Sequence, residues 1–382
     1  NINNNNNNKL LYIMSKFNYN ESEPTNPKTQ YSEHDILDFM IQDTADMDLV
    51  ANSVTISASL QVQEPSGTRC LNKKVYFNNN AGAHVFCESV TVSSNLGQHE
   101  HISQYPRMVA MFEVASKGDN DTFNSSDACE MISTSIEQSQ AYCSGNVTAG
   151  GGSSTHIADD CDWVIKPRCI LNKMSANLPF SKVGYVKLSI TLSNIIDALF
   201  TSEATPTLNY ILTDVKCHYK TAPTQNQSVM MRSVVPIRTS INSSNANISA
   251  KVPAICDSVS CIFMKQADDS SVTTNQQKLD KLLKLDSVNF LFNDNLNEHI
   301  TFELTDRGTI IQNFIESMGD TGHNRVNSNY WKSNHMGVGL NWGQMVDLTN
   351  QKFNVSLKTD AGVSNANPYF VDMFFHSIVA IK

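Results

Sequence analysis

The residues in this sequence that most resemble a metal site are His99, Glu100 and His101. Two histidines at positions i and i+2 of a strand point to the same face of a sheet, so their imidazoles could share one ion. The nearest acidic residue downstream, Glu113, falls in a segment that is predicted to be helical. We therefore expect surface histidines at the end of a strand rather than a metal centre.

Cys256 and Cys261 are a second pair that invites a metal-site interpretation. They lie in one predicted strand at an odd spacing, so we expect them to face opposite sides of the sheet and to make a poor zinc pair. Asp306, Arg307 and Gly308 open a predicted helix, and Asp306 is placed to cap it near the positive end of its dipole. Both patterns favour structural roles, as buried thiols and as a helix cap.

Aromatic residues offer one further candidate site. Tyr330, Trp331 and Trp342 could form a platform on which sugar rings stack, although aromatic residues of the core or of a subunit contact are the more common case. The sequence has no Gly-x-Ser-x-Gly elbow and no Walker loop, and no Gly-x-Gly-x-x-Gly follows a predicted strand. We therefore predict no enzyme activity, no catalytic residue, no cofactor and no metal.

The length and the charge of the chain limit the number of its domains and the partners that it can bind. A chain of 382 residues is long enough for two cores, because single cores seldom grow beyond about 250–300 residues. The formal net charge of −9 does not supply the positive field that direct nucleic-acid binding requires. No run approaches the ~20 apolar residues that would span a bilayer, and no segment resembles a secretory signal.

The sequence contains nine cysteines, which cannot all pair within one chain. Their spacings do not fit a compact disulfide framework. We expect reduced and mostly buried thiols, and therefore folding in a reducing compartment.

Alternation of apolar and polar residues predicts strands. The clearest case is Tyr185–Ser193, in which Val186, Leu188, Ile190 and Leu192 share one face. Arg107–Lys117 instead places apolar side chains at helical spacing. Further strands are predicted over 54–62, 75–77, 85–92 and within 163–171.

The first 46 residues are expected to form a partly disordered arm, because they begin with an asparagine tract and have little to bury. Within the arm, Ser32–Ile41 has a capping residue and helical spacing. This predicts a short helix that either packs on the first domain or docks on a neighbouring subunit. The sequence does not begin with methionine, and Met14 is a candidate start.

The second half of the chain repeats the order of the first. Strand Cys256–Met264 and helix Thr309–Met318 each follow a counterpart by about 201 residues, and the closing strand Tyr369–Ile381 matches Tyr185–Ser193 in role. We predict an all-β fold of two consecutive eight-stranded antiparallel sandwiches, each with a short helix. The first spans residues 47–203 and the second 207–382.

Three stretches resemble double jelly-roll major capsid proteins of polinton-like viruses and virophages. They are "NKMSANLPFSKVGYVKLSITLS" (172–193), "SNANISAKVPAICDSV" (244–259) and "ITFELTDRGTIIQNFIESMG" (300–319), the last followed by "TGHNRVNSN". None of them is a catalytic motif. The resemblance implies a major capsid protein that forms homotrimeric, pseudo-hexameric capsomers of an icosahedral double-stranded DNA virus.

The same resemblance implies the partners and the location of the chain. Its partners would be two further copies of itself, neighbouring capsomers, a penton protein and minor capsid proteins, and its location would be the virion capsid. Two rival functions remain: a glycan-binding β-sandwich that uses Trp331 or Trp342, and a cupin-like metalloenzyme that uses His99 and His101.

Overall fold

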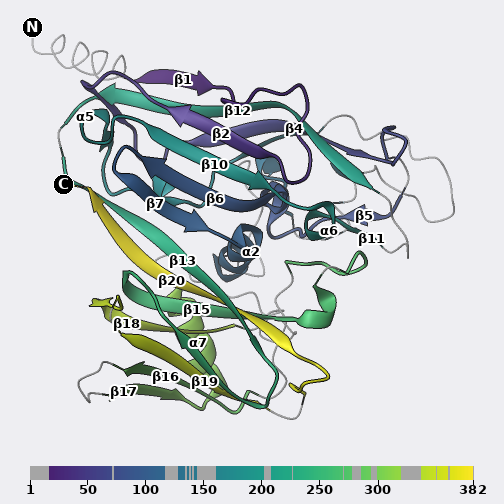
Figure 1. Ribbon diagram of the computed structural model, residues 1–382, viewed down its shortest axis with the longest axis vertical. Coiled ribbons are helices and arrows are strands. Elements are labelled where there is room, and N and C mark those ends of the chain that lie inside the picture. Colours follow the sequence, from purple (N-terminus) through teal and green to yellow (C-terminus); the bar gives the residue numbers. More distant parts are fainter. Residues whose placement is uncertain are drawn as a thin grey trace, which may run out of the picture.

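The computed structural model describes residues 17–70, 73–116, 128–133, 136, 139, 142–143, 161–201, 208–225, 227–269, 271–277, 285–293, 299–319, 337–349, 351–359 and 362–381. Figure 1 shows two β-sandwiches, with helix α2 lying between them. Both are built from antiparallel strand pairs. The all-β fold class predicted from the sequence is confirmed.

The first sandwich contains a long sheet and a four-stranded sheet. The long sheet has the order β8-β4-β12-β3-β9, with β1 on the other edge of β12. Its strands are β1 (Asn18–Ser22), β3 (Met47–Leu49), β4 (Thr55–Gln63), β8 (Cys161–Ile165), β9 (Leu178–Pro179) and β12 (Asn209–Pro223). The facing sheet contains, in order, β2 (Ile36–Ile41), β10 (Val186–Leu192), β6 (Cys87–Ser94) and β7 (Gly97–Ile102).

Shorter elements close the first sandwich. Two short strands, β5 (Val75–Tyr76) and β11 (Phe200–Thr201), pair with each other. Helix α2 (Tyr105–Ser116) buries Met108 and Met111, as its apolar spacing predicts. The remaining elements are η1 (Gly82–Phe86), η2 (Ile170–Asn172), α5 (Phe180–Val183) and α6 (Ile195–Ala198). No helix among the described residues is long and apolar enough to cross a bilayer.

The second sandwich contains two four-stranded sheets. The first has the order β13 (Val229–Ile241), β20 (Tyr369–Ile381), β15 (Ile255–Lys265) and β18 (Val338–Asp347). The second has the order β14 (Asn245–Ala250), β19 (Lys352–Lys358), β16 (Ser287–Asn293) and β17 (His299–Leu304). Helix α7 (Arg307–Ser317) packs against β18, and η3 (Gln266–Asp268) follows β15.

The two sandwiches repeat one arrangement of strands. The order β1-β12-β4-β8 corresponds to β13-β20-β15-β18, and β2-β10-β6-β7 corresponds to β14-β19-β16-β17. The predicted duplication is confirmed, but one assignment within it was wrong. Strand Tyr369–Ile381 is the counterpart of β12 rather than of Tyr185–Ser193, because it pairs with β15 as β12 pairs with β4.

The boundary between the sandwiches lies later than the predicted 203–207. Strand β12 pairs with β4, so the first sandwich continues through Pro223, and the first strand of the second sandwich begins at Val229. The polar stretch before Asn209 suggested a linker, but polar composition cannot show that the chain returns to the same sheet. The pairing across about 150 residues of sequence decides it.

The predicted helix at Ser32–Ile41 was wrong. Strand β2 occupies Ile36–Ile41, and Leu37, Phe39 and Ile41 alternate into the core. Apolar residues at 36, 37, 40 and 41 fit a helical period as well as a strand, and pairing with β10 selects the strand. Residues 17–46 therefore belong to the first sandwich rather than to a separate arm, and residues 1–16 lie outside the described residues.

Candidate functional site

The most unusual chemistry of the described residues lies where the two sandwiches meet. Helix α2 and strand β7 of the first sandwich face β13 and β20 of the second (Figure 1). Charged side chains are almost absent from the interior of a protein unless they are paired. At this junction, Glu100, Arg107 and Asp372 are each no more than 3% exposed.

Arg107 and Asp372 form a buried ion pair that joins the two sandwiches. Arg107 Nε donates to Asp372 Oδ2 at 2.5 Å, from α2 to β20. The guanidinium also donates to the carbonyl oxygens of Gln276 at 3.0 Å and Phe263 at 3.3 Å. The donors of Arg107 are therefore directed at acceptors on the second sandwich, which offsets the cost of burying the charge.

Arg238 adds a second cation to the same carboxylate. Its Nε donates to Asp372 Oδ1 at 2.6 Å, and its guanidinium carbon lies 4.8 Å from the centroid of the Phe370 ring. Burial alone would raise the pKa of Asp372, but the two arginines hold the pKa of this carboxyl below its usual value. Asp372 is therefore ionised at neutral pH and fixes both arginines in place.

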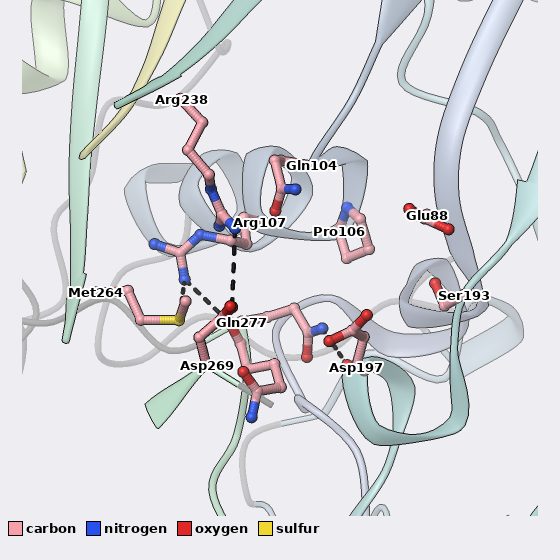
Figure 2. Close-up of a pocket in the computed structure, with 11 residues that line it drawn as sticks. Glu88, Gln104, Pro106, Arg107, Ser193, Asp197, Arg238, Met264, Asp269 and Gln277 are labelled. Carbon is pink, nitrogen blue, oxygen red and sulfur yellow. Dashed lines mark hydrogen bonds and ion pairs between the residues drawn. The ribbon is translucent and has the colours of Figure 1, made fainter. Parts of the chain in front are cut away.

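A cavity of about 170 Å³ lies beside this ion network. Figure 2 shows Arg107 and Arg238 on one side of it, with Glu88, Ser193 and Asp197 on the other. Both arginines in its lining are engaged by Asp372. The cavity is therefore part of a polar seam between the two sandwiches.

The raised pKa of Asp197 predicts how the stability of this seam depends on pH. Burial raises the pKa of Asp197, and the nearby carboxylates Asp269 and Glu88 raise it further. A carboxyl whose folded pKa is raised costs stability at pH values above that pKa, and the cost disappears below the unfolded value. Asp197→Asn should therefore raise the urea midpoint at pH 7 and lose this advantage near pH 3. An unchanged or lowered midpoint at pH 7 would contradict this interpretation, with the exposed Asp286→Asn as the control.

Glu100 joins the sandwiches at a second point. Its carboxylate accepts hydrogen bonds from the backbone N–H of Ile170 at 2.8 Å and from that of Val234, on β13, at 3.0 Å. Burial raises the pKa of Glu100, and the neighbouring Lys173 opposes this rise. Lys173 Nζ in turn lies 5.1 Å from the centroid of the Phe112 ring. The carboxylate of Glu100 thus accepts a hydrogen bond from one backbone N–H of each sandwich.

The histidines on either side of Glu100 contact different residues of β6, and a register shift in the β6–β7 pairing lies between the two contacts. The ring of His99 pairs with Ser94 Oγ at 2.7 Å, and that of His101 pairs with Thr91 Oγ1 at 2.8 Å. Glu113 lies in α2, as predicted, and accepts a hydrogen bond from Arg168 at 2.6 Å. No group of three or more His, Cys, Asp or Glu side chains is placed to hold a metal ion in the part of the chain that the structure describes.

The expected faces of Cys256 and Cys261 were wrong. Both thiols are buried in the core of the second sandwich. A β-bulge between Cys256 and Ser258 shifts the alternation by one residue, so an odd spacing brings the two side chains to the same core. All nine cysteines are free, and burial raises the pKa of Cys256 to about 12.

The remaining predicted residues have local roles. Asp306 caps α7 by accepting a hydrogen bond from the Thr309 N–H at 2.9 Å, and this bond lowers the pKa of Asp306. Gly308 follows in the first turn. Trp342 donates its indole N–H to the Cys256 carbonyl at 2.9 Å and packs on Phe353. Tyr330 and Trp331 lie outside the described residues.

Sequence reasoning missed the residues of the junction. The available signal was a single carboxylate, Asp372, within the largely apolar strand Tyr369–Ile381. A charge at a buried position implies a partner of opposite charge, but the sequence does not name Arg107, 265 residues away, as that partner.

Comparisons with known proteins concern the fold. No protein-family model matches the chain, and no curated protein matches it. Among solved structures, the Faustovirus major capsid protein superposes with a TM-score of 0.60 at 8% identity, covering 96% of this chain and 90% of that one. The capsid protein VP54 of the virus PBCV-1 gives 0.56 at 9%, covering 96% and 95%. A chain of the Sputnik virophage structure gives 0.55 at 9%, covering 96% and 86%. The double jelly-roll architecture implied by the three sequence stretches is thus confirmed, and this chain has the fold of these viral capsid proteins.

Proposed function

We propose that this chain is the major capsid protein of an icosahedral double-stranded DNA virus of the polinton-like or virophage type. The observation that carries the proposal is the duplication: one chain contains the same arrangement of strands twice. The viral capsid proteins named above have the same architecture over nearly the whole chain.

The duplication suggests how the protein acts. Three chains around a threefold axis present six similar sandwiches, and such a pseudo-hexameric capsomer can occupy a sixfold position in a curved lattice. This requires the two sandwiches of one chain to keep a fixed angle. The buried pairs Arg107–Asp372 and Glu100–Val234 join them at two separate points, which supports a rigid double unit. The proposed mechanism is assembly, without a chemical reaction.

The proposal extends to partners and location. The chain would contact two further copies within the capsomer, neighbouring capsomers, a penton protein at the vertices and minor capsid proteins beneath the shell of the virion. A net charge of −9 favours a genome that is contacted by other components. Nine free cysteines suit folding and assembly in a reducing compartment of the host cell.

The oligomeric mass of the purified protein tests the proposal. We expect a trimer of about 127 kDa, three times the chain mass of 42.3 kDa, that persists on dilution. Persistence is expected because obligate interfaces bury about 2,000–5,000 Å². Light scattering after size-exclusion chromatography measures this mass. A particle of 42.3 kDa at every concentration and salt condition would contradict the proposal.

A further inference from the structure

The first strand of the chain is held far more weakly than its counterpart. Strand β1 pairs with β12 over five residues, and none of the five is buried. Its counterpart β13 pairs with β20 over thirteen residues and buries Val229 and Met231. A strand without buried side chains opens at a low free-energy cost, because little apolar surface is exposed when it leaves.

Residues 17–26, here called the strap, cover two sheet edges at once. β1 lies along the outer edge of β12, on the side away from β4. The chain then crosses to β2, where Thr25 N donates to Asp38 O at 2.7 Å and Asn26 Nδ2 donates to Ile36 O at 2.6 Å. Without the strap, both sandwich edges would present unpaired backbone groups, which are ready to pair with another extended chain.

The other contacts of the strap are weak. Within these ten residues, all of which the structure describes, only Pro24 is buried. Glu21 pairs with Lys216 at 2.6 Å, but both side chains are more than one-third exposed, and exposed ion pairs contribute little. The strap is therefore held mainly by backbone hydrogen bonds, which an identical strap from another chain would reproduce without loss.

Two aromatic residues of the strap gain little from its present position. Phe17 is 55% exposed and Tyr19 is 67% exposed. The ring of Tyr19 rests on His218, with centroids 5.9 Å apart. Large apolar side chains on an edge strand mark a surface that a second protein can cover.

The chain around the strap provides a hinge and an anchor. Residues 27–30 are all exposed. Tyr31 is buried, and its N–H donates to Leu212 O at 2.9 Å. Lys28 within this stretch bonds to Tyr31 and Asp35 of its own chain, so a strap that leaves its sheet would pivot on the residues before Lys28 while Tyr31 stays in place.

We propose that the strap exchanges between copies of this chain, so that β1 of one copy pairs with β12 and caps β2 of a second copy. The bonds lost in one chain are remade in the other, so that Tyr19 rests on His218 of the second copy. Strap exchange can be tested separately from the trimer proposed above, because cross-linking reports the exchange and light scattering reports the mass.

A disulfide cross-link tests the exchange in the full-length chain. Ser22 lies directly opposite Cys217 in the β1–β12 register, and residues so placed have Cα atoms about 4.5–5.5 Å apart, within reach of a disulfide. One tagged chain carries Ser22→Cys and Cys217→Ser, and a second chain carries neither change. After mixing and oxidation with copper phenanthroline, we expect a disulfide-linked pair of one tagged and one untagged chain on non-reducing gels.

A matched control uses the neighbouring residue on the opposite face of β1. A tagged chain with Glu21→Cys and Cys217→Ser should give no linked pair, because position 21 lies opposite His218 instead. The single variant Ser22→Cys reports whether the bond can form at all. If it forms an internal disulfide while the mixed chains stay unlinked, exchange between copies is refuted.

A second measurement does not depend on disulfide geometry. A fluorescent peptide of residues 17–31 should bind the full-length protein by displacing its own strap. Successive backbone N–H groups of a strand point to opposite sides, so one of residues 19 and 20 donates its N–H to the partner strand. Replacing both residues of the peptide by proline (Tyr19→Pro with Asn20→Pro) removes that donor and should weaken binding by about tenfold or more. Absence of saturable peptide binding, or equal binding of the proline peptide, would overturn the proposal.

Discussion

Replacing Asp372 by alanine is expected to lower the free energy of unfolding by about 3–5 kcal/mol. The carboxylate holds Arg107 at 2.5 Å and Arg238 at 2.6 Å, and it is itself 2% exposed. Its removal leaves the Arg107 cation buried between the sandwiches without a counter-charge. Urea denaturation followed by circular dichroism measures the loss, which far exceeds that of a typical surface substitution.

Two variants control for this prediction. Asp286 is an exposed aspartate, and Asp286→Ala should change stability by no more than about 0.5 kcal/mol. The triple variant Asp372→Leu, Arg107→Met and Arg238→Met removes the charges together and should recover much of the loss, since apolar replacements of buried ion networks are often tolerated. A loss below about 1 kcal/mol for Asp372→Ala would show that the network does not hold the junction.

Glu130→Gln should cost about 3 kcal/mol at neutral pH. Burial alone would raise the pKa of Glu130, but His84, Arg168 and the Lys166 N–H together lower it from 4.5 to about 2. Arg168 lies 3.1 Å from the carboxylate, Lys166 N lies 2.9 Å from it, and His84 Nε2 lies at the longer ion-pair distance of 3.4 Å. These contacts favour the ionised form in the folded chain.

The sign of this effect fixes its pH dependence. A carboxyl whose folded pKa is lowered contributes stability that is complete above its unfolded pKa of about 4.5 and is lost as pH falls through its folded pKa of about 2. The difference in unfolding free energy between the natural chain and Glu130→Gln should therefore shrink between pH 4.5 and pH 2. Glu303→Gln, at an exposed position on β17, should show no such trend. A difference that stays constant over this range would contradict the assignment.

The sequence by itself determined several of the strands and that the order of elements recurs in the second half of the chain. The alternation in Val186–Leu192 and in Thr55–Gln63 depends only on the period of two along a strand, which is a local property. The helical spacing of α2 is local in the same way. Repeated local patterns therefore predicted two similar β-sandwiches within one chain.

Only the tertiary structure decided which segments become neighbours. Strand β2 was mistaken for a helix because its apolar residues fit both a helical and a strand period. Only its pairing with β10 selects the strand. Strand β12 was assigned to the wrong sandwich because a polar stretch precedes it. Arg107 meets Asp372 across 265 residues, and Glu100 meets Val234 across 134. Such contacts depend on how whole sheets pack, and side-chain periodicity carries no information about a partner so distant in the chain.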